Sequence, residues 1–87
     1  MVGSMTGEQV REFKEILKGH LGEIASALEF EAGKHPADID IERLEELKSM
    51  LEKVIQGVKI FQDGLYDEKY GMESGDVAIS KLKEIQW

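Results

Sequence analysis

Residues 44–72, LEELKSMLEKVIQGVKIFQDGLYDEKYGM, decide the fold because apolar side chains recur in them at a spacing of seven. One series consists of Leu44, Leu51, Val58, Leu65 and Met72, and a second, three residues further on, of Leu47, Val54 and Phe61. This repeat is typical of a helix whose apolar seam packs against other helices. The same spacing relates three glycines beside the seam, which are Gly57, Gly64 and Gly71. The pattern predicts a packing surface and names no substrate.

A first long helix is predicted upstream of this segment. Thr6 and Gln9 have the spacing of a capping box, and Met5 and Val10 occupy the two positions of a hydrophobic staple. Apolar residues, Leu21 and Leu28 among them, then recur every three or four positions until Gly33, which resembles a helix stop, and we expect this face to be buried. We therefore expect a helix over about residues 7–32, preceded by a disordered leader or cloning scar over residues 1–5.

The second and third helices have less certain bounds in the sequence. Asp38 and Asp40 are both plausible N-caps, so a second helix is expected over about residues 39–63. The heptads continue beyond Gly64, and the helix either ends near this glycine or runs on to about Tyr70; a break between residues 63 and 72 is favoured. A short third helix is expected over about residues 76–86, capped by Ser74 or Asp76.

These elements predict one all-α domain over residues 6–87. A connection of about six residues between two long helices favours an antiparallel hairpin. The third helix then folds back onto the hairpin or reaches a second chain. Two long amphipathic helices and one short one do not enclose a full core, so we expect homo-oligomerisation, most simply a homodimer, to complete a bundle.

Charge and composition exclude several partners. The chain has 11 basic and 18 acidic residues, a net charge of −7, and no two basic residues are adjacent. The electrostatic footprint of a nucleic-acid-binding protein is therefore missing. No apolar run approaches the roughly 20 residues that span a bilayer, and no cysteine is present for disulfides or thiolate-bound metal. We predict a soluble cytoplasmic protein without nucleic-acid or membrane partners.

The sequence offers little candidate chemistry. His20 and Glu23 lie one turn apart, but carboxylate-bridged metal bundles use the order Glu-x-x-His on two helices and further glutamates from two others. His35 has no partner visible in the sequence, and Ser74 is interpreted as a helix cap. Motifs for a nucleophile, a phosphate-binding loop or an EF-hand are absent. We therefore predict no enzyme, no catalytic residue, no metal and no cofactor.

Aromatic side chains in the last third of the chain suggest where contacts form, because tyrosine and tryptophan are common interface anchors. We predict a non-enzymatic interaction or assembly module that acts through self-association. The alternative is an acidic adaptor or inhibitor of a basic partner protein, and a third hypothesis is a carboxylate/His metal-binding bundle. The predicted interface consists of Leu44, Leu47, Leu51, Val54, Val58, Phe61, Tyr66, Tyr70 and Trp87.

Overall fold

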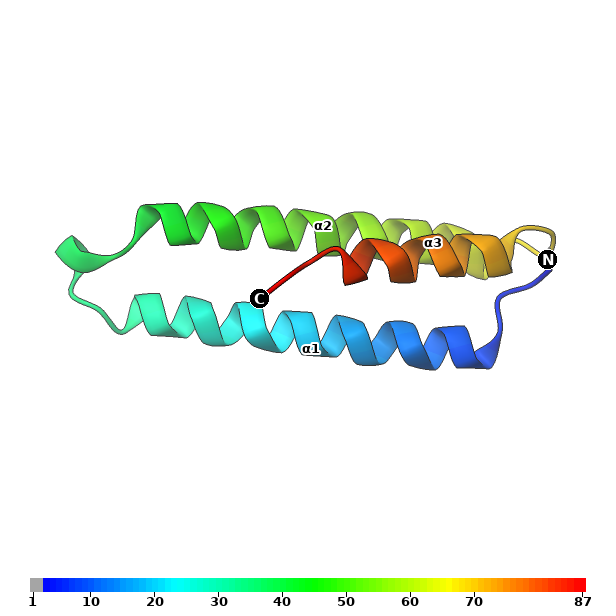
Figure 1. Cartoon of the computed structure of the whole chain (residues 1–87), viewed down its shortest axis with the longest axis horizontal. Coiled ribbons are helices and arrows are strands. Elements are labelled where there is room, and N and C mark those ends of the chain that lie inside the picture. Colours follow the sequence, from blue (N-terminus) through cyan, green and yellow to red (C-terminus); the bar gives the residue numbers. More distant parts are fainter. Residues whose placement is uncertain (1–2) are drawn as a thin grey trace.

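The computed structural model describes residues 3–87 and is all-helical over this range, which confirms the predicted fold class. Its elements are α1 (Gly7–Ala32), the short 3₁₀ helix η1 (Pro36–Asp38), α2 (Ile41–Leu65) and α3 (Gly71–Lys83). In Figure 1, α1 and α2 lie side by side and η1 sits where the chain turns between them. The third helix lies along the half of this pair that is nearer the N-terminus, in a molecule of 52 × 18 × 18 Å.

The start of α1 is fixed by the predicted capping box, which is confirmed. The Gln9 backbone N–H donates to Thr6 Oγ1 at 3.1 Å, and the Thr6 N–H donates to Gln9 Oε1 at 3.0 Å. Each bond satisfies a backbone donor that the first turn of a helix otherwise leaves free. At the start of α2, Asp40 plays the capping role and accepts from the Arg43 N–H at 3.1 Å. These local bonds set where both long helices begin.

The third helix differs from the sequence prediction. It begins at Gly71, five residues before the expected start, and ends at Lys83 rather than near residue 86. The turn before it explains the early start, because Asp67 Oδ1 accepts from the Lys69 and Tyr70 N–H groups, both at 2.9 Å. Ser74 consequently lies inside α3 and is not its cap. The predicted break in the heptad segment is confirmed, with α2 ending at Leu65.

The residues expected to form a disordered leader pack against the α2–α3 turn where the structure describes them. The Gly3 N–H donates to the Lys69 carbonyl and the Met72 N–H donates to the Gly3 carbonyl, both at 2.8 Å. Met5 packs against the apolar core. Residues 1–2 of the expected leader lie outside the described range. Gly3 to Met5 are thus part of the fold; the staple position of Met5 is a local signal for its packing, whereas the bonds of Gly3 have none.

The apolar core lies in the half of the molecule that contains α3. The Phe13 and Phe61 rings stack with centroids 4.0 Å apart and planes inclined by 12°, which joins α1 to α2. Ala78 and Leu82 of α3 have no exposed surface and complete the cluster. Burying a side chain such as that of Leu82, Phe13 or Phe61 contributes roughly 1.5 to 3 kcal/mol relative to exposure. The third helix is therefore a main contributor to the core despite its short length.

Glycines let α3 approach α2 closely. A Cβ added to Gly64 would lie 2.6 Å from the Ser74 Cβ, and one added to Gly57 would lie 2.8 Å from Leu82 Cδ2. Both distances are shorter than carbon atoms tolerate without displacement. Gly57 and Gly64 are helical residues without positive φ. The sequence pattern of glycines at heptad spacing is therefore explained by space for α3, and not by a need for unusual backbone angles.

Candidate interaction surface

The heptad repeat of α2 divides into three rows with different surroundings. Leu47, Val54 and Phe61, here called the core row, are all at most 6 % exposed. Gly57 and Gly64, the glycine row, face α3. The leucine row consists of Leu44, Leu51, Val58 and Leu65, which are half-buried or exposed.

Helix geometry places the leucine row on the side of the α1–α2 pair away from α3. Successive residues are separated by 100° around an α-helix, so a step of four residues amounts to about 40°. The steps from Gly57 to Phe61 and from Phe61 to Leu65 therefore turn in the same direction, and the core row lies between the other two. The α1–α2 pair thus has α3 on one face and the leucine row on the other.

Large apolar side chains continue across this second face onto α1. Ile24, Leu28, Leu44, Leu47, Lys48 and Leu51 line a depression of about 280 Å³ between the two helices. Leu21 lies two turns before Leu28, and Ile55 one turn after Leu51, so both extend the same surface. We call this surface the open face. It comprises Leu21, Leu28, Leu44, Leu51, Ile55, Val58 and Leu65, five of which are 37–45 % exposed.

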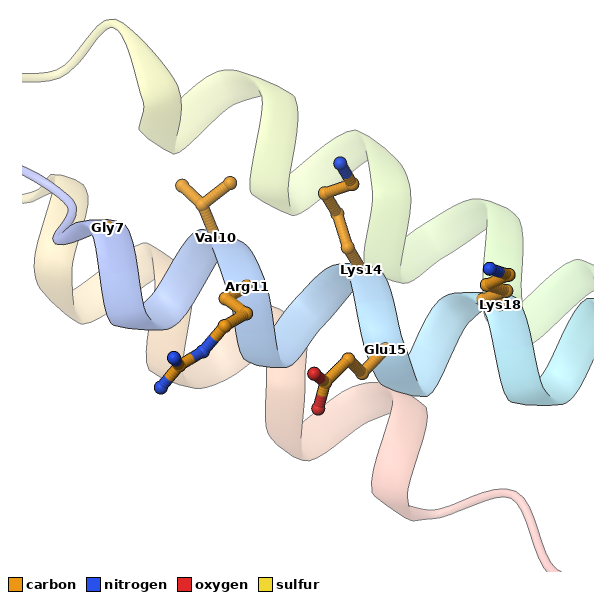
Figure 2. Close-up of a pocket in the computed structure, with 6 residues that line it drawn as sticks. All are labelled: Gly7, Val10, Arg11, Lys14, Glu15 and Lys18. Carbon is orange, nitrogen blue, oxygen red and sulfur yellow. The ribbon is translucent and has the colours of Figure 1, made fainter.

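A basic strip lies on α1 toward the end of the molecule that holds the N-terminus. Arg11, Lys14 and Lys18, with Gly7, Val10 and Glu15, line a depression of about 410 Å³ (Figure 2). Figure 2 shows Val10, Lys14 and Lys18 pointing to the same side of α1, whereas Arg11 and Glu15 point away from it. Lys14 and Lys18 are four residues apart, which brings these two basic side chains to one side of the helix.

The predicted interface residues fall into three groups in the structure. The core row is occupied within the chain's own core, whereas Leu44, Leu51 and Val58 belong to the open face. Of the aromatic residues, Tyr66 is 90 % exposed in the α2–α3 turn, where Tyr70 is also exposed. Trp87 lies against α1. Sequence reasoning named the α2 half of the open face but missed Leu21 and Leu28, which it assigned to a buried stripe.

His20 joins α1 to the C-terminal end of the chain. Trp87 Nε1–H donates to His20 Nδ1 at 2.9 Å, and His20 Nε2 lies 2.7 Å from the Leu82 carbonyl oxygen. Because Nδ1 accepts, the hydrogen-bond network assigns the proton of a neutral imidazole to Nε2, which donates to the carbonyl. Both ring nitrogens thus have protein partners. This arrangement gives His20 a structural role and leaves neither nitrogen free as a metal ligand.

Two carboxylates stabilise turns rather than forming a reactive site. The Asp40 backbone N–H donates to Glu31 Oε1 at 2.9 Å, and Lys34 Nζ donates to both Glu31 oxygens. The Asp40 bond and then the Lys34 bonds lower the pKa of Glu31. The Tyr70 and Lys69 N–H groups likewise lower the pKa of Asp67. In each case the donors favour the charged form of the carboxylate, because they donate hydrogen bonds to it.

Within residues 3–87, no group of three or more histidine, aspartate or glutamate side chains is arranged to hold a metal ion. In the same range, no helix combines the length and the apolar character that crossing a membrane requires. Comparison of the chain with protein-family models, curated proteins and solved structures finds no match.

Proposed function

We propose that this protein is a non-enzymatic assembly module that self-associates through the open face. Two antiparallel α1–α2 hairpins pair face to face, so that four long helices surround a shared apolar layer. The third helix of each copy lies on the outside. The observation that carries the proposal is the row of apolar side chains opposite α3, five of which are 37–45 % exposed.

The size of the open face supports pairing of two copies. A helix of 26 residues is about 39 Å long at 1.5 Å per residue. With a molecular width of 18 Å, the face covers about 700 Å². A stable dimer commonly buries about 800 Å² on each partner.

The distribution of charge favours a second copy as the occupant. A net charge of −7 on each chain opposes association. Lys14 and Lys18 border the open face on α1, and Lys48 lines its depression, so basic residues accompany the apolar ones there. Acidic residues such as Glu45 and Glu52 lie beside the leucine row on α2, within reach of a partner's lysines. The opposing charges reduce repulsion where the two copies meet.

Sedimentation equilibrium of charge-substituted variants tests the proposal. The wild-type protein is expected at twice the 9.8 kDa mass of one chain, and the double variant Leu51→Glu/Ile55→Glu at the mass of one chain. The control is Val77→Glu, which puts one such charge on an exposed apolar residue of α3 and should leave the dimer intact. Circular dichroism checks that all variants stay helical.

Two results would overturn the proposal. The first is a wild-type protein that remains a strict monomer at high micromolar concentration, which would favour the acidic adaptor hypothesis. The second is a dimer whose dissociation constant is the same in Leu51→Glu/Ile55→Glu and in Val77→Glu. Such a result would place the contact away from the open face.

A further inference from the structure

The turn between α2 and α3 resembles an interrupted helix. Residues 66–70 contain neither glycine nor proline, and no non-glycine residue in the described range has a positive φ. Two bonds across the turn already have the spacing of an α-helix, from the Gly71 N–H to the Asp67 carbonyl and from the Ser74 N–H to the Tyr70 carbonyl, each at 3.0 Å. Straightening this turn into a helix therefore requires few new bonds.

The heptad frame continues through the turn without insertion or deletion. Leu65 at the end of α2 is followed at intervals of seven by Met72 and Ile79 in α3. The glycine row likewise continues through Gly71 to Ala78. An unrelated turn sequence would have shifted the frame, because any inserted length other than a multiple of seven moves the seam around the helix. One uninterrupted helix over residues 41–83 would thus keep all its rows aligned.

The contacts between α2 and α3 are symmetric about the turn. Gly64 meets Gly71 and Ser74, and Gly57 meets Ala78 and Leu82. Each contact joins residues at nearly equal distances from a point near residues 68–69. A two-fold axis through this point would relate two straightened helices in antiparallel orientation. The α2 segment of one chain would then meet the α3 segment of the other with the same residue pairs.

We propose that α3 exchanges between two copies of this chain. Each α3 then packs against α1 and α2 of the partner, in the place where it otherwise packs against α1 and α2 of its own chain. Domain swapping of this kind conserves the contacts of the closed monomer and changes only the hinge. The contacts between α1 and α3 are reproduced as well, because side chains make them. Gln9 Nε2 donates to the Met72 carbonyl at 2.7 Å and to Asp76 Oδ1 at 2.8 Å, and Lys83 lies 3.1 Å from Glu12. The exchange does not depend on the open face.

Specific bonds at the hinge hold the closed form. Asp67 Oδ1 accepts two N–H groups of the turn, from Lys69 and Tyr70, which would bond to carbonyls four residues earlier in a continuous helix. Gly3 occupies the Lys69 carbonyl and the Met72 N–H, a pair of groups that a continuous helix would also use internally. Closed and exchanged forms therefore compete for the same backbone groups. The side chain of Asp67 favours the closed form only through its hydrogen bonds within the turn.

The experiment uses the Leu51→Glu/Ile55→Glu chain, so that open-face pairing does not contribute. Into it we introduce Asp67→Ala, which removes the turn bonds and adds a strong helix former. Loss of a capping side chain should raise the dimer-to-monomer ratio by about tenfold or more, since both hinges of a dimer benefit. The matched control is the Leu51→Glu/Ile55→Glu chain with two glycines inserted between Glu68 and Lys69. This insertion lengthens the turn and breaks the heptad frame.

Size-exclusion chromatography followed by small-angle X-ray scattering reads the outcome after incubation at millimolar concentration. The exchanged dimer extends in opposite directions from the hinge, so its maximum dimension should be about twice the 52 Å of one chain. The insertion variant should remain monomeric. The proposal is wrong if Asp67→Ala yields only monomer, if its dimer is no longer than about one chain, or if the insertion variant forms the long dimer equally well. Failure of the open-face proposal would instead show as a wild-type monomer, or as a dimer that Leu51→Glu/Ile55→Glu does not weaken, and would leave this result unaffected.

Discussion

Replacing Gly64 with alanine is expected to destabilise the protein, although Gly64 lies inside α2. A helical glycine normally gains about 1 kcal/mol on substitution by alanine. Here the added Cβ would lie 2.6 Å from the Ser74 Cβ and 3.4 Å from the Gly71 carbonyl oxygen. Neither atom is at the end of a side chain that can rotate away, so α3 must shift. Overpacking of this kind costs about 1 to 3 kcal/mol, which outweighs the helix gain.

Gly19→Ala is the matched control. Gly19 is an exposed residue within α1, and a Cβ added there meets nothing within 4 Å. This variant should be stabilised by about 0.5 to 1 kcal/mol. The free energies of unfolding of the two variants, from urea titrations followed by circular dichroism at 222 nm, should therefore differ by about 2 kcal/mol. Equal stabilisation by both substitutions would refute close packing of α3 on Gly64.

Three further outcomes follow from the polar contacts. Gln9→Ala removes the bonds that join the start of α1 to α3 and should lower the free energy of unfolding by about 1 to 3 kcal/mol in a urea titration. The folded-state pKa of Glu31 is lowered, so its stabilising contribution is present above the ordinary value near pH 4.3 and is lost as the pH falls through the lowered pKa. Urea midpoints measured from pH 7 to pH 3 should fall less steeply for Glu31→Gln. His20→Leu removes one bond to the Leu82 carbonyl, which still accepts from the Ile85 N–H, and should cost about 0.5 to 1.5 kcal/mol. Trp87→Phe, at a half-exposed position, should cost less in the same thermal or urea unfolding assay.

The predictable parts of this fold are those with local signals. The capping box at Thr6 and Gln9 indicates the start of α1 because both residues of the motif are adjacent in sequence. The start of α3 was misplaced because glycine propensity was weighed against it at Gly71. In the folded chain, contact with Gly64 and the hydrogen bond to Asp67 determine this residue's conformation. The contact with Gly64 depends on how α3 folds back onto α2, and no local sequence pattern states this.

The interaction surface was only partly predictable for a related reason. A heptad repeat identifies apolar rows, but it does not state which row packs inside the chain and which remains exposed. That assignment depends on the position of α3, which covers the glycine row and leaves Leu51 and Leu65 at the surface. Leu21 and Leu28 were expected to be buried because their apolar stripe is continuous with Ile24. Both residues lie on the face of the α1–α2 pair that points away from α3, so no third helix covers them.

Isotope-filtered nuclear Overhauser spectroscopy on an equimolar mixture of ¹³C-labelled and unlabelled protein tests the open-face account most directly. The account predicts intermolecular contacts from the methyl groups of Leu28, Leu51 and Ile55 at high micromolar concentration, and their loss in Leu51→Glu/Ile55→Glu. Contacts between chains that involve Tyr66 or the outer side of α3 alone, or a complete absence of intermolecular contacts, would contradict it.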